Sequence, residues 1–327
     1  MSVRRRLLPA LIAALALALP ACSNGSAAPA GPVDLSKVTL HVGDQAGIQQ
    51  ALLQASGALN GAPYAVQWAE FPAAAPLLES LRARAIDIGI AGDAPTLNAL
   101  AASNDITIVA GNRSPQQGGL AIIVPAGSPI KTVADLRGHT VSPTTQGSIG
   151  HYLLLQALAQ AGLTAQDVKI SFLQPVDAAA ALQSGAIDAW STWDPYTAVA
   201  QKEQGVRVLR DATGLASGLS FLDASNNSLD NPSLRAAMTD FVHRYNQALQ
   251  WAQANPTELT GIYAKLTGRS QDVAGLVAQR SQRSGIPLTP DVVAELQRVA
   301  DNYRRYGVLH NDVVVAQRID DLGTARS

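Results

Sequence analysis

The sequence predicts an α/β fold with largely parallel sheets, arranged as two lobes, and two observations support this prediction. From Val38 to about residue 230, short β-rich runs alternate with runs rich in alanine and leucine. This alternation is typical of βα units that build a mostly parallel sheet. One loop–helix–strand–loop unit also occurs twice in the chain, which indicates two lobes of the same architecture. After Asn231 the pattern becomes helical.

Each element is expected where the local pattern changes. Strands are expected at the β-rich runs Thr39–Gly43, Ala65–Trp68, Ile86–Ile90, Ile106–Ala110, Leu120–Val124, His139–Ser142, Val168–Phe172, Ala186–Trp190 and Val206–Leu209. Helices are expected between them at Gln45–Gly57, Ala73–Arg84, Thr96–Ala102, Ile149–Ala161, Ala178–Ser184 and Tyr196–Glu203. Four more are expected in the C-terminal region, at Pro232–Asn255, Thr257–Thr267, Ser270–Arg283 and Pro290–Arg305.

The two copies of the internal repeat contain corresponding pairs of aspartates. Residues 71–95 begin F-P-A-A-A and end A-I-D-I-G-I-A-G-D-A-P, and residues 176–195 begin V-D-A-A-A and end A-I-D-A-W-S-T-W-D-P. In both copies Ala-Ile-Asp is followed by a second aspartate, so that Asp87 and Asp93 correspond to Asp188 and Asp194. The alternative is coincidence in an alanine-rich sequence.

Two stretches mark where the chain would pass between the lobes. Pro125–Pro129 holds two prolines and a glycine, which indicates a turn or crossover, and Gly214–Asn227 is the candidate for a return crossover. We therefore expect lobe 1 at residues 37–125 and lobe 2 at residues 126–216. Residues 217–327 would contain the return crossover and C-terminal helices that pack mainly on lobe 1.

The N-terminus has the pattern of a bacterial secretion signal. Arginines at positions 4–6 precede the apolar run Leu7–Leu19, which is too short to span a bilayer. Cys22, the only cysteine in the chain, directly follows Ala21 and resembles the lipidated cysteine of bacterial lipoproteins. Residues 1–21 are therefore expected to be a cleaved signal peptide and Cys22 a lipid anchor. The alternative is an ordinary signal peptide with a chance cysteine.

Composition restricts what the rest of the chain can be. Residues 22–36 are small, polar and rich in proline and glycine, which predicts a flexible tether behind the lipid anchor. The formal net charge is −1, and the expected cleavage removes three arginines and no acidic residue. A nucleic-acid partner is therefore not indicated. Without a second cysteine there is no disulfide, and the 47% hydrophobic content is ample for a core.

Helix-start signals follow several of the predicted strands. They lie at Phe71-Pro72, Gly92–Pro95, Gln146–Ser148 and Trp193–Pro195. In open α/β sheets, ligands bind outside the carboxyl ends of the strands, where the following helices begin. Helix starts offer unpaired backbone N–H groups and the positive end of the helix dipole. The sequence therefore predicts an anion site made from neutral donors, without formal positive charge.

Five segments resemble the aliphatic-sulfonate-binding proteins of ABC importers. They are residues 68–81, 128–138, 147–163, 187–196 and 251–256, and the resemblance runs over nearly the whole chain after Val38. It is specific for the wider group that binds sulfonates, taurine, nitrate and thiamine precursors. The resemblance implies a periplasmic-binding-protein-like clamshell of type II, in which two lobes with central mixed sheets are joined by two crossovers.

The resemblance also implies a set of ligand contacts. The first lobe would supply Asp44, Gln45, Phe71, Gly92 and Asp93. The second lobe would supply Gln146, Gly147, Ser148, His151, Trp190 and Asp194. Position 93 is aspartate where these proteins commonly carry glutamate, and residues 111–119 look unlike the usual relatives.

Several of these residues have a structural alternative. Ser148 has the position of a helix N-cap, and Asp93 and Asp194 could equally cap helices. His151 could be a packed histidine. Trp190 and Trp193 lie on either side of a strand end, so that one of them is expected in the core, and we assign Trp190 to the cleft. Arg113 is either a counter-ion for the ligand or a surface charge.

The function that the resemblance implies is transport. An extracytoplasmic lipoprotein, on the cell membrane or in the periplasm, would capture an organosulfonate and deliver it to a permease with a cytoplasmic ATPase. No cofactor or metal is implied, and the protein is expected to be a monomer. The alternatives are another ligand (taurine, nitrate or a thiamine precursor), a desulfinase-like enzyme, and a sensory or scaffolding lipoprotein. An enzyme is disfavoured because the one cysteine lies at the expected anchor and the five histidines show no ligand spacing.

Overall fold

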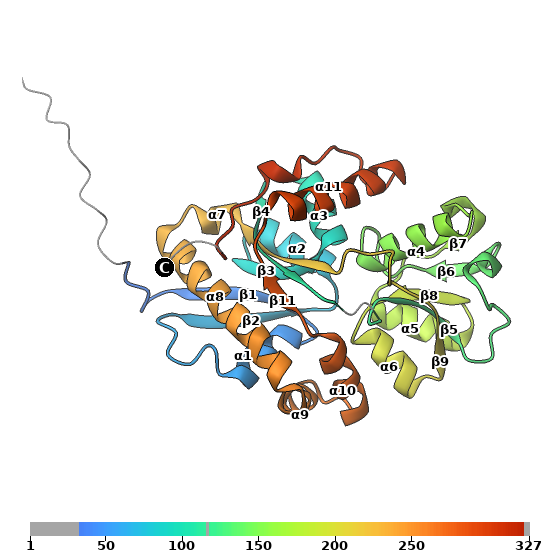
Figure 1. Cartoon of the computed structure of the whole chain (residues 1–327), viewed down its shortest axis with the longest axis horizontal. Helices are drawn as coiled ribbons and strands as arrows, with labels where there is room; N and C mark the ends of the chain where they lie inside the picture. Colours follow the sequence, from blue (N-terminus) through green and yellow to red (C-terminus); the bar gives the residue numbers. More distant parts are fainter. Residues whose placement is uncertain (1–32, 116–117, 324–327) are drawn as a thin grey trace, which may run out of the picture. The chain divides into compact units, whose positions relative to one another are not determined.

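The computed structural model describes residues 33–115 and 118–323, and these residues form two mixed β-sheets with helices packed on them (Figure 1). The first sheet has the strand order β11-β4-β10-β3-β1-β2. Its strands are β1 (Thr39–Gln45), β2 (Ala65–Phe71), β3 (Ile88–Gly92), β4 (Ile106–Arg113), β10 (Leu219–Ser225) and β11 (Ser284–Ile286). The second sheet has the order β7-β6-β8-β5-β9. Its strands are β5 (Ala121–Pro125), β6 (Thr140–Ser142), β7 (Lys169–Ile170), β8 (Ala189–Thr192) and β9 (Val206–Asp211).

The helices follow the strands closely in the first two-thirds of the chain. They are α1 (Ile48–Ser56), α2 (Ala74–Arg82), α3 (Asp93–Ala102), α4 (Ile149–Gln160), α5 (Pro175–Ser184), α6 (Tyr196–Glu203) and α7 (Asn226–Leu229). The C-terminal helices are α8 (Pro232–Ala254), α9 (Pro256–Thr267), α10 (Gln271–Arg280) and α11 (Pro290–Arg305). The prolines that open α8, α9 and α11 suit the first helical turn, where a missing N–H costs no hydrogen bond.

Both sheets combine parallel and antiparallel pairs. In the first sheet, β1 pairs in parallel with β2 and β3, whereas β10 runs antiparallel between β3 and β4. In the second sheet, β6 pairs in parallel with β7 and β8, whereas β5 is antiparallel to β8 and β9. The predicted α/β class is confirmed, but the expectation of largely parallel sheets is wrong, since five of the nine strand pairs in the described residues are antiparallel.

The sequence analysis did not predict strand β10. Residues 219–225 lie within the stretch predicted as a crossover, yet they form a fully buried strand between β3 and β4. A buried carboxylate on this strand, Asp223, interrupts the apolar run L-S-F-L-D-A-S and hides the strand pattern. The strand becomes stable because it completes the sheet, which is a tertiary effect.

The two passages between the sheets are short. The first lies between Arg113, the end of β4, and Ala121, the start of β5, so residues 121–125 belong to the second sheet. The boundary predicted after residue 125 is therefore several residues too late, because the proline-rich turn follows β5 rather than preceding it. The second passage lies between Asp211 and Leu219, at the predicted boundary near residue 216.

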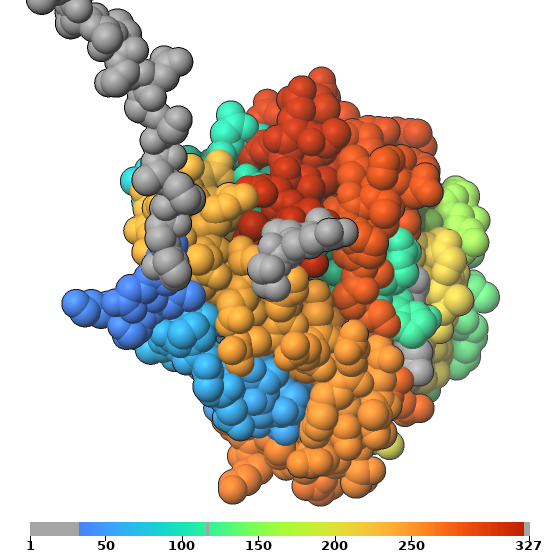
Figure 2. Space-filling model, turned by 60° about the vertical axis from the view of Figure 1, so that its left-hand side comes forward, coloured from blue at the N-terminus to red at the C-terminus, as the bar shows by residue number. Residues whose placement is uncertain are grey.

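The C-terminal helices pack largely on the first sheet and its helices. Helices α8 and α9 contact α1, α8 contacts β11, and α11 contacts α3. Figure 2 shows the segments of α8 and α9, in orange, beside N-terminal segments, in blue, on one face of the molecule. Contacts also reach the elements of the second sheet: α10 packs on α6, the Tyr303 hydroxyl of α11 donates to the Ser148 carbonyl at 2.6 Å, and Asn302 Nδ2 of α11 donates to the Tyr152 hydroxyl at 3.1 Å.

The internal repeat has a matching hydrogen-bond pattern in the two sheets. The Asp87 carboxylate accepts the backbone N–H of His41 at 2.8 Å, and its Oδ2 lies 3.2 Å from Nδ1 of the same residue. The Asp188 carboxylate accepts the N–H of Thr140 at 2.8 Å and lies 3.2 Å from Nδ1 of His139. The two copies therefore tie equivalent strands together in the same way.

No helix among residues 33–115 and 118–323 is long and apolar enough to cross a membrane. The expected signal peptide, Cys22 and most of the tether lie outside the described residues.

Candidate functional site

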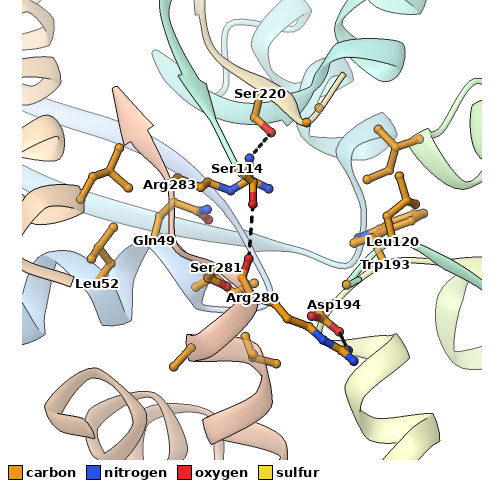
Figure 3. A pocket seen from close by; sticks show the side chains of 18 of the residues that line it. Gln49, Leu52, Ser114, Leu120, Trp193, Asp194, Ser220, Arg280, Ser281 and Arg283 are labelled. Carbon is orange, nitrogen blue, oxygen red and sulfur yellow. Dashed lines mark hydrogen bonds and ion pairs between the residues drawn. The ribbon is translucent and has the colours of Figure 1, made fainter. Parts of the chain in front are cut away.

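A cavity of about 1150 Å³, part of it open to solvent, lies where the two sheets face each other (Figure 3). Its wall combines the starts of α3 and α4, the residues after β8, strand β10 and helices α1, α8, α9 and α10. A neighbouring recess of about 670 Å³ shares Gln49, Gly92, Ile149, Asp194 and Arg283 with it. We treat the two as one cleft.

The starts of α3 and α4 meet in this cleft, as the helix-start signals predict. A Cβ atom on Gly92 would lie 2.5 Å from Cγ2 of Ile149, so only glycine permits the approach. The first backbone N–H groups of a helix have no partner within the helix. Two sets of such donors therefore lie at the same edge of the cleft, where they favour a negative charge.

Arg283 brings a formal positive charge into the cleft, which the sequence analysis did not predict. It follows α10, and its Nη1 donates to Asn112 Oδ1 at 3.2 Å and to Ser220 Oγ at 2.9 Å. Burial lowers the pKa of Arg283, but an arginine remains charged under physiological conditions. Within the described part of the chain, Arg283 forms no ion pair with a carboxylate. The site thus combines neutral donors with one guanidinium.

A second arginine, Arg280, also lines the cleft and binds residues just before and within α6, beside the second sheet. Its Nη1 lies 3.4 Å from Asp194 Oδ1, and its Nη2 donates to Gln201 Oε1 at 2.8 Å (Figure 3). No local sequence signal marks either arginine, because both come from a segment far along the chain that returns to the cleft.

Asp194 lines the cleft and also caps a helix. Its Oδ1 accepts the N–H of Ala198 at 3.0 Å, whereas its Oδ2 is buried and has no partner among the described residues. Burial raises the pKa of Asp194 to about 6, against the lowering effect of Arg280. Gly119 leaves room for this carboxylate, since a Cβ there would lie 2.4 Å from Asp194 Oδ2.

Asp93 likewise lines the cleft and serves the start of its helix. Its Oδ1 accepts the N–H of Ala94 at 2.6 Å, and its Oδ2 accepts the Ser217 hydroxyl. Burial raises the pKa of this fully enclosed carboxyl group. Asp93 is the first residue of α3, whose N-cap is Gly92, so its carboxylate binds a first-turn N–H without being the N-cap, and it also lines the cleft.

Asp44 and Gln45 end strand β1. The Asp44 carboxylate accepts the N–H groups of Gln49 and Gln50 at 3.2 and 2.9 Å, and burial raises its pKa to about 6. Asp44 does not contribute to the cleft wall, whereas Gln45 does. The Gln45 Nε2 atom donates to the carbonyl of Ile90 at 2.7 Å, which leaves its Oε1 for other contacts.

Ser148 and His151 are engaged with each other at the start of α4. The Ser148 hydroxyl donates to the carbonyl of Pro143 at 3.0 Å and accepts the N–H of His151 at 3.1 Å, so it is an N-cap that also touches the recess. The His151 Nδ1 accepts the N–H of Gly147 at 3.2 Å, which places a proton on Nε2. Burial lowers the pKa of His151 to about 4, so the ring is neutral. The ring packs edge-on against Phe172 and does not line the cleft.

Gln146 and Gly147 face a different hollow. With Ser148 they line a pocket of about 520 Å³ beside α2 and α3, which shares only Pro95 and Ser148 with the recess. The structure therefore separates these two predicted contacts from the main cleft.

The tryptophan on the cleft wall is Trp193, not Trp190. Trp190 is 1% exposed, and its Nε1 donates to Thr144 Oγ1 at 2.9 Å inside the core of the second sheet. Trp193 follows the last residue of β8 and lines the cleft. The assignment of Trp190 to the cleft disagrees with this placement, because the side chain at that strand position points to the interior.

Phe71 ends β2 and packs against the core of the first sheet rather than lining the cleft.

Arg113 is bound to a carboxylate outside the cleft. Its Nη1 and Nη2 donate to the two oxygens of Glu295, at 3.0 and 2.7 Å, and Nη1 also donates to the carbonyl of Ser217. Such a two-pronged pair fixes the guanidinium and neutralises its charge. Arg113 does not line the cleft, whereas Arg280 and Arg283 do.

The chemistry of the cleft suits an anion with an apolar part. Arg283 supplies charge, the starts of α3 and α4 supply neutral donors, and Trp193 with the C-terminal helices supplies apolar surface. No group of three or more His, Cys, Asp or Glu side chains in residues 33–115 and 118–323 could hold a metal ion.

Comparisons with known proteins agree with this reading of the fold. The model of the NMT1/THI5-like family matches residues 70–259. A putative aliphatic sulfonates-binding protein from Escherichia coli (strain K12) is 36% identical over 255 residues, which cover 78% of this chain and 79% of that protein.

Two solved structures are similar over most of the chain. The alkanesulfonate-binding protein SsuA from Xanthomonas axonopodis pv. citri bound to MOPS has a TM-score of 0.80 and 30% identity, covering 86% of this chain and 98% of that chain. The periplasmic aliphatic sulphonate binding protein SsuA from Escherichia coli has a TM-score of 0.76 and 34% identity, covering 86% and 92%. The predicted periplasmic-binding-protein-like fold is thereby confirmed, and the chain belongs to the NMT1/THI5-like family, as a relative of the aliphatic sulfonates-binding proteins.

Proposed function

We propose that this protein is the substrate-binding component of an ABC importer and that its ligand is an organosulfonate. The observation that carries the proposal is the guanidinium of Arg283, which lines a largely apolar cleft and forms no ion pair with a carboxylate of the described residues. A sulfonate is ionised at any biological pH, so it needs hydrogen-bond donors and positive charge rather than a proton acceptor. The sulfonate-binding relatives support the same ligand class.

The sulfonate lies, in this proposal, between Arg283 and the starts of α3 and α4, next to Gly92 and Ile149. This revises the purely neutral anion site, because Arg283 adds a charge that the sequence did not reveal. Ser148 keeps its hydroxyl for capping, and Trp193, rather than Trp190 or Phe71, contacts the organic part of the ligand. Hydrogen bonds to a charged group contribute about 1.5–3 kcal/mol each, and three to five of them, less desolvation, reach roughly micromolar affinity.

The remaining parts of the proposal concern location and partner. A lipid on Cys22 would hold the protein on the extracytoplasmic face of the membrane, through the tether of residues 22–36, while it passes its ligand to a permease. Cys22→Ser tests the anchor, because the variant should leave the membrane fraction or stay uncleaved. A variant that partitions with membranes like the wild type would show that the anchor is elsewhere.

A thermal-shift screen tests the ligand class. The set contains alkanesulfonates, taurine, nitrate, sulfate and pyrimidine precursors of thiamine. A ligand at 100 times its dissociation constant stabilises the protein by about 2.7 kcal/mol, which a melting curve resolves. Stabilisation by alkanesulfonates alone supports the proposal, and stabilisation by nitrate or a thiamine precursor alone contradicts it. Incubation with an aryl sulfinate, followed by a sulfite assay, tests the enzymatic alternative.

A further inference from the structure

Two helix contacts of different chemical character join the two sheets. We call residues 121–211 the second-sheet part, and residues 34–113 and 219–323 the first-sheet part. Helix α4 of the second-sheet part packs against α3 and α11, and helix α6 packs against α10 and the residues after β2. Figure 1 shows α4 and α11 in the upper half of the view and α6 and α10 in the lower half. A rotation of one part against the other therefore strains at least one of these contacts.

The α4 contact is buried and aromatic. Tyr152 of α4 and Tyr303 of α11 pack edge to face, with their ring centroids 5.0 Å apart, and they are 3% and 0% exposed. The Tyr303 hydroxyl donates to the Ser148 carbonyl at 2.6 Å. Asn302 Nδ2 donates to the Tyr152 hydroxyl at 3.1 Å. Separation at α4 would expose both rings and leave buried polar groups without partners, and both effects oppose it.

Further contacts extend along α4 in both directions. At its start, a Cβ atom on Gly147 would lie 2.7 Å from Cγ of Asn98 in α3, so the two parts touch there through a backbone without a side chain. Farther along, the Tyr306 hydroxyl of α11 donates to Gln156 Oε1 at 2.7 Å. Leu155 is buried in the same apolar cluster as Tyr303. The first-sheet part therefore holds α4 from the residues before it to beyond its midpoint.

The α6 contact consists of small apolar side chains and of polar groups that water can reach. Ala198 of α6 is buried in a cluster with apolar residues of α10. The Tyr196 hydroxyl donates to the Pro72 carbonyl at 2.7 Å, in an exposed position. The Ser270 hydroxyl donates to Glu203 Oε1 at 2.9 Å, also in an exposed position. Water replaces exposed hydrogen bonds at little net cost, and alanine buries little apolar area, so separation at α6 costs less than separation at α4.

Arg280 supplies the most buried polar contact of α6, and one half of it is long. Its Nη1 lies 3.4 Å from Asp194 Oδ1, whereas charged hydrogen bonds are usually about 2.7–2.9 Å long. Its Nη2 donates to Gln201 Oε1 at 2.8 Å. Because Arg280 lines the cleft, water in an opened cleft could hydrate it after it releases both partners.

We propose that the second-sheet part pivots on α4, and that the cleft opens only where α6 separates from α10 and from the residues after β2. The contact of α4 with α3 and α11 is then permanent, and the exposed hydrogen bonds of Tyr196 and Glu203 are the closing hydrogen bonds. A ligand enters and leaves between Pro72 and Tyr196, which both line the recess. This inference deepens the proposed function and rests on it only for the choice of ligand, because the contacts themselves involve none.

Distances between nitroxide spin labels, measured by pulsed electron paramagnetic resonance, test where the two parts separate. In the full-length chain, Cys22→Ser removes the only native cysteine. Lys202→Cys with Asp272→Cys then labels exposed positions on α6 and α10. The matched pair, Ala159→Cys with Arg305→Cys, labels exposed positions on α4 and α11. The α6–α10 pair should give a broad or bimodal distribution that sodium hexanesulfonate narrows and shortens, whereas the α4–α11 pair should give one narrow distribution throughout.

The outcomes separate this proposal from the proposed function. A change at the α4–α11 pair, or equal changes at both pairs, overturns the permanent contact. Narrow distributions at both pairs that do not respond to bound hexanesulfonate overturn the opening itself. If calorimetry shows that no sulfonate binds, the proposed function is contradicted, and the ligand-free protein still tests the pivot: a broad α6–α10 distribution supports it and a narrow one overturns it.

Two single substitutions test the closing hydrogen bonds through the rate of ligand release, followed by stopped-flow tryptophan fluorescence. Glu203→Ala removes the acceptor of the Ser270 hydroxyl at a position outside the cleft. It should speed the dissociation of hexanesulfonate about two- to tenfold without a matching change in association. Tyr306→Phe, the control, removes one hydroxyl hydrogen bond on the α4 side and should leave both rates unchanged. Faster release in Tyr306→Phe, or unchanged release in Glu203→Ala, contradicts the assignment of the closing hydrogen bonds to α6.

Discussion

Arg280 and Asp194 join the C-terminal helices to the second sheet across the cleft, with 3.4 Å between Nη1 and Oδ1. Arg280 ends α10, and Asp194 lies just before α6, so the pair connects two elements that are distant in the chain. The second oxygen of Asp194 is buried without a partner among the described residues. An anion bound in the cleft would therefore interact with the charges of both Arg280 and Asp194.

The first prediction is that sulfonate binding strengthens as the pH falls through about 6. The pKa of Asp194 is raised to about 6 by burial, so the ionised carboxylate is present at neutral pH and repels an anion in the cleft. Protonation removes this charge and leaves Arg280 unpaired, and both changes favour an anion. Affinity should rise about three- to tenfold between pH 7.5 and pH 5.

The variant Asp194→Asn distinguishes the effect of Asp194 on binding from that of the two other carboxyl groups with a raised pKa, Asp44 and Asp93. The variant should bind with the affinity that the wild type has at low pH, and its pH dependence should largely disappear. Calorimetry at four pH values checks it. An unchanged pH profile in Asp194→Asn would assign the effect to another group.

The second prediction concerns the source of the positive charge. Arg283→Gln should weaken sulfonate binding about 10- to 150-fold, since a charged hydrogen bond contributes about 1.5–3 kcal/mol. Arg113→Gln is the matched control: it breaks the pair with Glu295 and should lower stability without a comparable change in affinity. The opposite result, with binding lost in Arg113→Gln and retained in Arg283→Gln, would move the counter-ion to Arg113.

The third prediction uses the two tryptophans around the end of β8. Trp193→Ala should weaken ligand binding and change stability little, because Trp193 is part of the cleft wall. Trp190→Ala should destabilise the protein by about 3–5 kcal/mol, because it removes a large side chain from the core of the second sheet. Denaturant unfolding and calorimetry on both variants check the pair. A stable Trp190→Ala protein that has lost binding would restore Trp190 as the ligand contact.

The fourth prediction concerns the space beside Asp194. Gly119→Ala should lower stability by about 1–3 kcal/mol and weaken binding, because its Cβ would lie 2.4 Å from the Asp194 carboxylate. Gly127→Ala, where a Cβ meets nothing within 4 Å, is the control and should be nearly neutral. Melting curves with and without ligand measure both effects. Equal melting temperatures for the two variants would mean that Asp194 moves aside freely.

The fifth prediction concerns Asp223, which is buried in β10. Its pKa is raised well above 3.8 by burial, although the Thr96 hydroxyl donates to it at 2.6 Å. A group with a raised pKa in the folded state stabilises the protein below its unfolded pKa and loses this contribution as the pH rises. Asp223→Asn, which cannot ionise, should therefore raise the melting temperature at pH 7.5 and change it much less at pH 4. A lower melting temperature at both values would show that the carboxyl group itself is required.

Local patterns in the sequence predicted most of the elements. The helices α8, α9 and α11 lie within two residues of their predicted ends, because proline starts and periodic apolar residues act over a few neighbouring positions. The repeat that relates Asp87 to Asp188 also corresponds to a shared hydrogen-bond pattern. The meeting of the starts of α3 and α4 followed from the general position of ligand sites in α/β sheets.

The sequence by itself thus determined the class of fold and the order of most of its elements, and it predicted an anion site at helix starts, since these depend on short-range patterning. Only the tertiary structure decided which side chains line the cleft. Strand β10 forms because it pairs with β3 and β4 on its two sides. Trp193 rather than Trp190 lines the cleft because of the direction in which β8 presents its side chains. Arg283 lies in the cleft because the C-terminal helices fold back onto it. Such placements depend on contacts between residues far apart in the chain, and no local pattern encodes them.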